Sequence, residues 1–163
     1  MKMELDLHDP KNRTFGRLVL AQRDFRDAKS FVQYVVTNIS YPNNFLFKPL
    51  NYAAVISYSR PFTKSEGYRP LPASYSLFAR QDFTNLHEQI LRMRNKCVAH
   101  SDEKLNKVFQ IVDQSNASLQ SPRHAIHSLY LSLDAFGLFK ELCDHHLDRL
   151  MRDLKNQRSQ KVK

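Results

Sequence analysis

The stretch LRMRNKCVAHSD, residues 91–102, gathers basic, amide, thiol and imidazole side chains within a few positions. Two of them, Arg94 and His100, have the chemistry needed to cleave RNA. The 2′-hydroxyl of RNA is a built-in nucleophile, so cleavage requires only proton transfer and stabilisation of charge on a pentacoordinate phosphate. A histidine that titrates near neutral pH can transfer the proton, and an always-charged arginine can stabilise the phosphate. These residues indicate a site that needs no metal ion.

The spacing of Arg94 and His100 sets a condition on such a site. On a regular helix, six residues correspond to about 600°, so the two side chains point about 120° apart and lie roughly 9 Å apart along the axis. They would not readily hold one phosphate from a single intact helix. Either the helix breaks at residues 99–100, or a second copy of the chain completes a shared cleft across a two-fold axis. The second arrangement predicts a homodimer.

A structural interpretation of the same residues remains open. His100 ends an apolar stripe whose members recur at steps of three and four, so it could be a buried histidine bonded to a backbone carbonyl. The neighbouring basic side chains would then complement the negative end of the helix dipole. The earlier members of the stripe are Phe83, Leu86, Ile90, Met93 and Cys97.

Other catalytic and metal-binding arrangements are weaker. Cys97 lies three residues before His100, but it continues the apolar stripe, where a small hydrophobic residue is the simpler explanation. Several histidine and carboxylate spacings could place two metal ligands on one helix face, but no recognisable motif positions a third. We therefore expect surface histidines, no metal and no cofactor. The spacings in question are His124 with His127, Glu141 with His145, and the run Asp144, His145 and His146.

The segment RNKCVAH, residues 94–100, resembles the defining motif of HEPN domains, which are compact helical bundles widespread in bacterial toxin–antitoxin and abortive-infection systems. The longer string LHEQILRMRNKCVAHSD, residues 86–102, looks like the helix that carries this motif in the abortive-infection branch of the family. The string NYAAVISYSRPF, residues 51–62, is similar to the second helix of that branch. With the helix pattern, these matches cover most of the chain.

The resemblance implies a metal-independent endoribonuclease that acts as a homodimer with the two motifs facing each other. Arg94, Asn95 and His100 would be catalytic, with Asn95 orienting the imidazole or donating to a phosphate oxygen. Arg92 and Lys96 would bind the nucleic acid. Such a protein would be a toxin or phage-defence effector held in check by a partner, for example an antitoxin of the nucleotidyltransferase type.

Two non-catalytic alternatives remain, because many HEPN relatives have lost activity or never had it. One is a module that binds nucleic acid or nucleotides without cleaving them. The other is a protein-interaction module whose basic face docks an acidic partner. Salt-dependent RNA binding without cleavage would favour the first, and copurification of an acidic protein without RNA binding would favour the second.

The elements that position this site are expected to be helices. The chain of 163 residues has only three glycines and lacks the regular turns of a β-sandwich or barrel. We predict one all-α domain over residues 1–163, a compact bundle of four to five long antiparallel helices. Residues 101–120 are ambiguous, and we favour a helix there over a short strand within residues 105–118. Apolar spacing predicts helices over residues 14–39, 45–58, 81–100 and 122–157.

The last of these helices would be roughly 50 Å long, which requires a bend near Gly137 or packing on a second subunit. Residues 63–76 are rich in proline and small polar residues, and we expect a loop that could act as a flap. Beyond the last helix, residues 156–163 are expected to form a disordered basic tail.

The bulk composition limits the class of protein. The formal net charge of +9 favours polyanionic partners, of which RNA is the one that the motif indicates. The chain has no apolar run long enough to span a bilayer, and its first residues lack the order of a secretory signal. We therefore expect a cytoplasmic protein that does not bind membranes, with Cys97 and Cys143 as buried free thiols.

Overall fold

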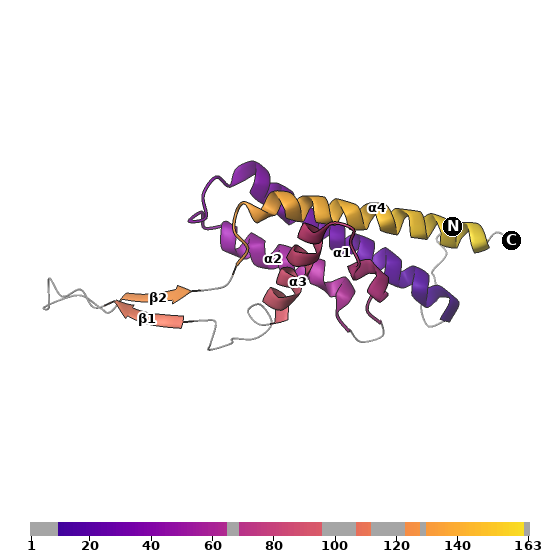
Figure 1. The fold of residues 1–163 in the computed structure, drawn as a ribbon, viewed down its shortest axis with the longest axis horizontal. Coiled ribbons are helices and arrows are strands. Elements are labelled where there is room, and N and C mark those ends of the chain that lie inside the picture. The colour runs from indigo at the N-terminus through magenta and orange to yellow at the C-terminus, as the bar shows by residue number, and fades with distance from the viewer. Residues whose placement is uncertain (1–9, 65–68, 96–106, 112–122, 128–129, 162–163) are drawn as a thin grey trace, which may run out of the picture.

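The computed structural model of the chain describes residues 10–64, 69–95, 107–111, 123–127 and 130–161. Within them the fold is helical, as predicted, with one added pair of short strands (Figure 1). The elements are the helices α1 (Pro10–Asn38) and α2 (Phe47–Ser59), the 3-10 turns η1 (Arg60–Phe62) and η2 (Ala73–Ser76), the helix α3 (Gln81–Met93), the strands β1 (Lys107–Ile111) and β2 (Arg123–His127), and the helix α4 (Ala135–Lys161).

Helix α1 is central to the bundle, because it packs against both α2 and α4. It runs antiparallel to α4, so the first turns of α1 and the last turns of α4 lie at the same end of the molecule (Figure 1). The alternating steps of three and four predicted its buried face correctly. The residues of that stripe, all at most 6% exposed, are Leu18, Ala21, Phe25, Ala28, Val32, Val35 and, just beyond the helix, Ile39.

Helix α2 matches the predicted helix closely and is followed by η1, where Pro61 has no backbone N–H to continue a helix. Its residue Asn51 is fully buried and joins α2 to the segment that leads into α4. The side-chain amide of Asn51 donates to the carbonyl of Leu131 at 2.9 Å, and its oxygen accepts from the Leu131 amide at 3.3 Å. One side chain thus satisfies two backbone groups that would otherwise be buried without partners.

Replacing Asn51 with alanine is expected to lower the free energy of unfolding by about 2–3 kcal/mol, because the backbone groups of Leu131 lose their partners. Urea denaturation monitored by circular dichroism measures the change. The matched control is Asn43→Ala, since Asn43 is exposed, and it should cost less than about 0.5 kcal/mol. Equal losses in the two variants would contradict this role for Asn51.

The segment between α3 and α4 differs from the prediction. Strands β1 and β2 pair antiparallel, with Lys107 opposite His127 and Ile111 opposite Arg123. The helix that we favoured for residues 101–120 is therefore wrong at 107–111, where the strand alternative is correct. The pair lies beyond the ends of the helices (Figure 1). Spacing along the chain does not reveal a strand-pairing partner, which explains the error.

The limits of the last helix are also different from those predicted. It begins at Ala135 and not at residue 122, because residues 123–127 form β2. It continues to Lys161, so residues 156–161 of the predicted disordered tail are helical. With 27 residues, α4 is about 40 Å long, shorter than predicted. A helix of this length has less need of a bend or of a second subunit to pack against.

The described part of the loop after η1 is attached to the bundle. The backbone amide of Leu71 donates to the carbonyl of Pro61 at 2.8 Å, and the side chains of Leu71 and Tyr75 are buried. From α4, Arg149 donates to the carbonyl of Ser74 at 2.8 Å. These contacts argue against a freely moving flap in the described part of residues 63–76.

Candidate functional site

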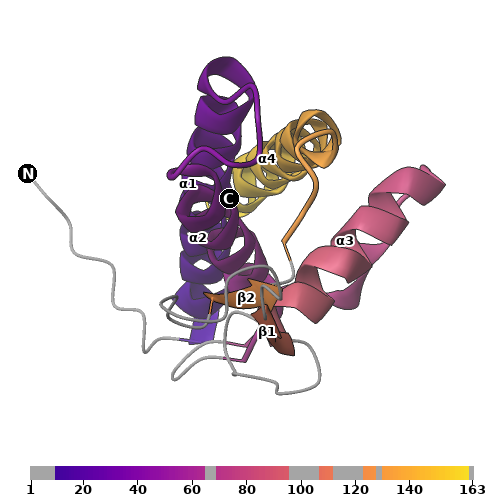
Figure 2. The same cartoon turned by 90° about the vertical axis from the view of Figure 1, so that its left-hand side faces the viewer.

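Helix α3 carries the start of the motif at its carboxyl end, so the contacts of α3 determine where the motif lies. The helix is strongly amphipathic and packs on α2 and α4, to one side of the other helices (Figure 2). The predicted stripe is confirmed for the residues that the structure describes. The buried residues of α3 are Phe83, Leu86, His87, Ile90 and Met93.

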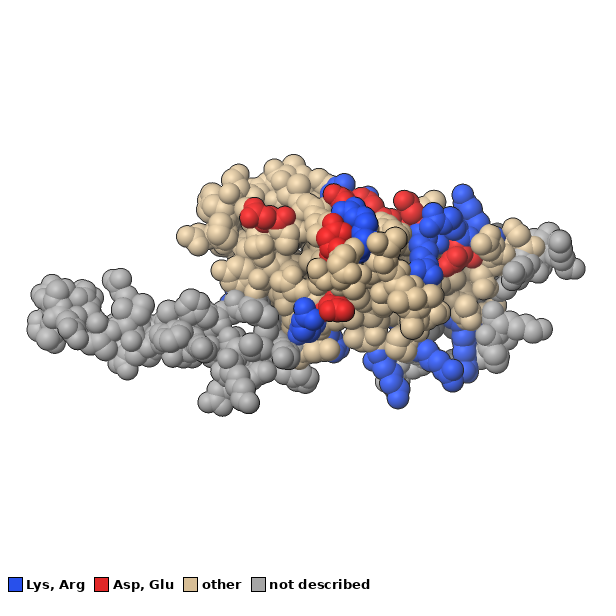
Figure 3. All heavy atoms as spheres, viewed as in Figure 1, with Lys and Arg blue, Asp and Glu red and all other residues tan. Residues whose placement is uncertain are grey.

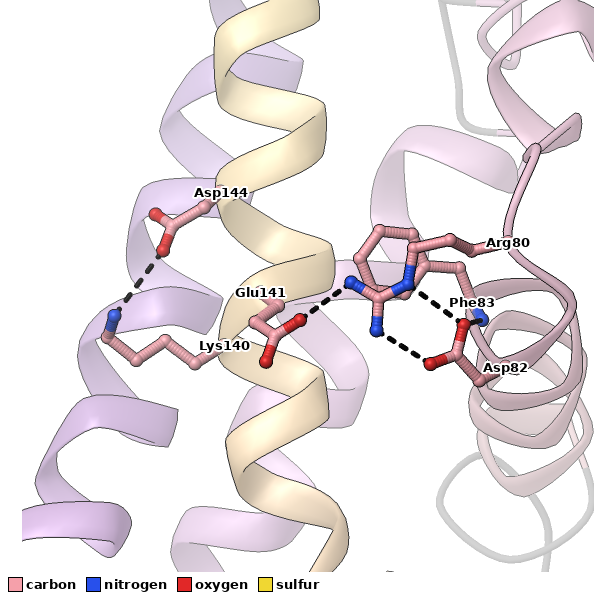
Figure 4. Close-up of polar contacts among 6 residues, drawn as sticks. All are labelled: Arg80, Asp82, Phe83, Lys140, Glu141 and Asp144. Atoms are coloured by element: carbon pink, nitrogen blue, oxygen red, sulfur yellow. Dashed lines mark hydrogen bonds and ion pairs between the residues drawn. The ribbon is translucent and has the colours of Figure 1, made fainter.

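The first turn of α3 is joined to α4 by Arg80 (Figure 4). The guanidinium of Arg80 donates to Glu141 on α4 at 2.7 Å and to Asp82 at 2.6 and 3.1 Å. It also lies over the ring of Phe83, 4.0 Å from the ring centroid. The hydrogen bond from Arg80 lowers the pKa of Asp82. The Asp82 carboxylate also accepts a hydrogen bond from the Phe83 amide. Its negative charge is stabilised by the positive, amino end of the helix dipole. The network is exposed, so it fixes geometry more than it adds stability.

A second polar connection joins α4 to α1. Asp144 pairs with Lys29 of α1 at 2.5 Å and with Lys140, one turn earlier on α4, at 3.4 Å. Figure 4 shows Asp144 and Glu141 leaving α4 in different directions, one contacting Lys140 and the other Arg80. Carboxylates on α4 therefore contact basic side chains from both α1 and the start of α3.

The middle of α3 is held by a buried polar cluster that sequence reasoning missed. The hydroxyl of Tyr58 on α2 lies 2.8 Å from Nδ1 of His87 on α3 and 3.0 Å from Nε2 of His146 on α4. All three residues are at most 3% exposed. One hydroxyl therefore connects three helices.

The protonation states of this cluster follow from its burial. Burial lowers the pKa of His87 to about 4 and that of His146 to about 3, so both rings are neutral at pH 7. Nδ1 of His146 is buried and has no hydrogen-bond partner within the described residues. Because orphaned buried N–H groups are rare, we assign the proton of His146 to Nε2, which donates to the Tyr58 oxygen. The Tyr58 hydroxyl then donates to Nδ1 of His87.

Aromatic rings enclose the cluster. The ring of His146 stacks on Phe25 of α1, with centroids 4.5 Å apart and planes 3° apart. The ring of Phe62 from η1 lies edge-on to His87, with centroids 4.6 Å apart. Burial also raises the pKa of the Tyr58 hydroxyl well above its ordinary value. The enclosed neutral groups are suited to holding helices together rather than to exchanging protons with a substrate.

Two of the predicted catalytic residues, Arg94 and Asn95, directly follow α3, where the regular α-helix ends. Regular α-helix ends at Met93, and residues 94–95 continue with a π-helical turn. The side chain of Arg94 donates to the amide oxygen of Asn95 at 3.0 Å. Arg94 is partly buried and Asn95 is exposed. These two predicted residues are thus brought together, while His100 lies outside the described residues.

Of the two residues predicted to bind nucleic acid, the structure describes Arg92 but not Lys96. Arg92 is exposed and forms an ion pair with Glu88, one turn earlier, at 3.3 Å. Such an exposed pair is weak and competes little with a phosphate. Lys96 lies outside the described residues, as does Cys97. The angle and distance predicted between Arg94 and His100 assumed a regular α-helix. At Arg94 and Asn95 the helix is instead a π-helical turn.

The histidines and cysteines considered as metal ligands or thiols can be placed in part. Within the described residues, no three histidine, cysteine or acidic side chains are grouped so that they could hold a metal ion. His124 and His127 lie on β2, so the helical spacing does not apply to them. The expectation of surface histidines is wrong for His146, which is fully buried. Cys143 is a buried free thiol, as predicted, and burial raises its pKa.

The signal for the buried histidines was present in the spacing. His146 follows Leu142 by four residues and Cys143 by three, and precedes Leu150 by four, so it occupies the buried seam of α4. His87 lies three residues before Ile90 in the same way. A histidine that continues an apolar stripe is at a core position when a hydrogen-bonding partner is buried nearby.

No protein family, curated protein or solved structure matches the chain. The resemblance to HEPN domains therefore stays a prediction from the residues that carry it. Among the described residues, no helix combines the length and the apolar character needed to cross a membrane.

Proposed function

We propose that the chain is a HEPN-like, metal-independent endoribonuclease that acts in the cytoplasm as a toxin or phage-defence effector. In this proposal the active site is a composite of two copies of the chain, with Arg94, Asn95 and His100 as its catalytic residues. An antitoxin of the nucleotidyltransferase type is the proposed partner that inhibits the activity.

The observation that supports the proposal is that the Arg94 side chain is not paired with a carboxylate within the described residues. Other arginines near α3 are paired with carboxylates, Arg80 with Asp82 and Glu141, and Arg92 with Glu88. Arg94 forms no ion pair with any carboxylate in the described part of the chain; its side chain contacts the neutral amide of Asn95. A guanidinium oriented by a neutral group keeps its positive charge available for a phosphate.

The reaction that fits these residues is a transesterification. The 2′-oxygen attacks the adjacent phosphorus and loses its proton, while the 5′-oxygen leaves and gains one, which yields a 2′,3′-cyclic phosphate. His100 would transfer protons, and Arg94 would stabilise the charge on the phosphoryl oxygens. Asn95, whose oxygen accepts from Arg94, keeps its amide hydrogens for the phosphate or the imidazole.

The test is to incubate the purified protein with RNA in excess EDTA and to analyse the ends of the products. We expect cleavage with 2′,3′-cyclic phosphate ends, and no cleavage of the same sequence with 2′-O-methyl groups throughout. Absence of cleavage by a folded dimer, or equal cleavage of both substrates, would overturn the catalytic proposal. RNA binding without cleavage would instead favour a non-catalytic nucleic-acid-binding module.

A further inference from the structure

One end of the molecule concentrates basic side chains that are far apart in sequence. The end is formed by the first turns of α1, the segment from η1 to η2 and the last turns of α4 (Figure 1). Arg17 of α1 donates to the carbonyls of Arg60 and Pro61, which fixes η1 on α1. Tyr75 of η2 donates to Asp153 and fixes η2 on α4. These bonds hold the described parts of the three segments together at this end.

We name this surface the basic end and define it by its exposed basic residues. Lys and Arg side chains gather at this end in the face shown in Figure 3. Two of them, Lys64 and Arg69, lie between Pro61 and Leu71 in the chain, and the Leu71 amide donates to the Pro61 carbonyl. The residues of the basic end are Arg13, Arg60, Lys64, Arg69, Arg152 and Lys155.

The acidic residues that the structure describes at this end, Asp24, Asp148 and Asp153, are fewer than the six exposed basic residues. Asp24 is 3% exposed and lies between Arg23 at 3.2 Å and Arg60 at 3.8 Å. Asp153 accepts the hydroxyl of Tyr75. Asp148 is exposed one turn before Arg152 but forms no ion pair in the described part of the chain. The described side chains of the basic end therefore carry a net positive charge.

We propose that the basic end binds the phosphodiester backbone of nucleic acid without reading the bases. Clustered arginine and lysine side chains attract phosphates and release counterions, which makes the affinity dependent on salt. Reading bases by stacking requires exposed aromatic rings. The exposed aromatic residues of the described chain lie elsewhere, in the second half of α1, the turn after it and the segment before α4. Of the aromatic residues in the described part of the basic end, Tyr75 is buried beneath the guanidinium of Arg149, and Phe15 and Phe62 are partly buried against the core.

The same composition argues against an anionic membrane as the partner. Stable membrane binding by a basic surface needs a second, apolar contribution. In the described part of the chain, the exposed large hydrophobic residues near the basic end are Val19, Leu77 and Met151, which are 41%, 73% and 46% exposed. They come from three different segments, α1, the residue after η2, and α4, as single side chains.

The test measures binding separately from cleavage. Fluorescence anisotropy with a labelled 2′-O-methyl oligouridine, which cannot undergo transesterification, reports the affinity at several salt concentrations. For Arg152→Gln/Lys155→Gln we expect an affinity on the order of 10-fold lower than that of the wild type near physiological salt. The slope of log affinity against log salt should fall in magnitude by about 1.4. A protein that cleaves no RNA should still show this binding.

The matched control removes the same number of charges away from the basic end. Arg26→Gln/Lys48→Gln changes an exposed residue in the second half of α1 and one at the start of α2, and should leave most of the affinity intact. Oligoadenosine and duplex probes of the same chemistry should bind within a few-fold of oligouridine. The proposal is overturned if both double variants lose affinity equally, if the affinity does not depend on salt, or if the protein binds phosphatidylserine vesicles but not the oligonucleotides.

Discussion

Replacing His100 with alanine is expected to slow RNA cleavage by about 10²–10⁴-fold, the range that general acid–base catalysis usually contributes. The residual rate would come from binding and from Arg94, which the substitution leaves in place. Single-turnover cleavage in excess EDTA measures the effect, with circular dichroism as the control that the protein is folded. Equal rates for the wild type and His100→Ala would show that this histidine has no catalytic role.

Mixing two inactive chains tests the composite site directly. In a heterodimer of Arg94→Ala and His100→Ala chains, one shared site would combine an intact Arg94 with an intact His100 from the other copy. After subunit exchange at equal concentrations, about one quarter of the wild-type activity should return if each site takes one residue from each copy. Two variants that remain inactive after verified exchange would contradict this division of the site between subunits.

Acidification from about pH 7.5 to about pH 5 is expected to lower the free energy of unfolding by about 4 kcal/mol through His87 and His146. In the unfolded chain both rings take up protons near pH 6.5. In the folded chain burial lowers the pKa of His87 to about 4 and that of His146 to about 3. The unfolded state therefore binds more protons in this range. The stability is full above pH 6.5 and falls by about 2 kcal/mol for each ring by about pH 5.

Urea denaturation at a series of pH values measures this dependence. In His87→Gln/His146→Gln the two titrating groups are gone, and the loss of stability on acidification should shrink accordingly. His145, whose pKa burial also lowers, is present in both proteins and cancels in the comparison. The single variant His87→Gln should lose about half of the effect. A variant that keeps the full pH dependence of the wild type would contradict the assignment.

The sequence predicted the helices whose buried faces follow one local period. Leu18 to Ile39 and Phe83 to Met93 are examples, because each stripe meets a bundle core along its whole length. The start of α4 was mispredicted for the opposite reason. Ile126 continues the helical spacing, but its segment is in β2, which pairs with residues that precede it by a long connection. Pairing across such a connection leaves no periodic signal in either strand alone.

The candidate site was predictable only in part. The adjacency of Arg94 and Asn95 follows from their neighbouring positions, but the π-helical turn that places them was not predicted. The buried cluster around Tyr58 depends on residues from three helices, which a stripe on one helix cannot identify. The basic end likewise depends on hydrogen bonds that bring η1 onto α1 and η2 onto α4.

The hydrogen bond between Tyr58 and His146 has a consequence for the synthesis of the chain. The two residues are 88 positions apart, and α4 covers the same central helix as α2 does. Ribosomes extend a chain by roughly 5–20 residues per second, so α1 and α2 emerge several seconds before the helix that completes their shared core. During that interval the apolar face of α1 remains partly uncovered. We expect tertiary structure to form late in translation, after α4 has left the ribosome.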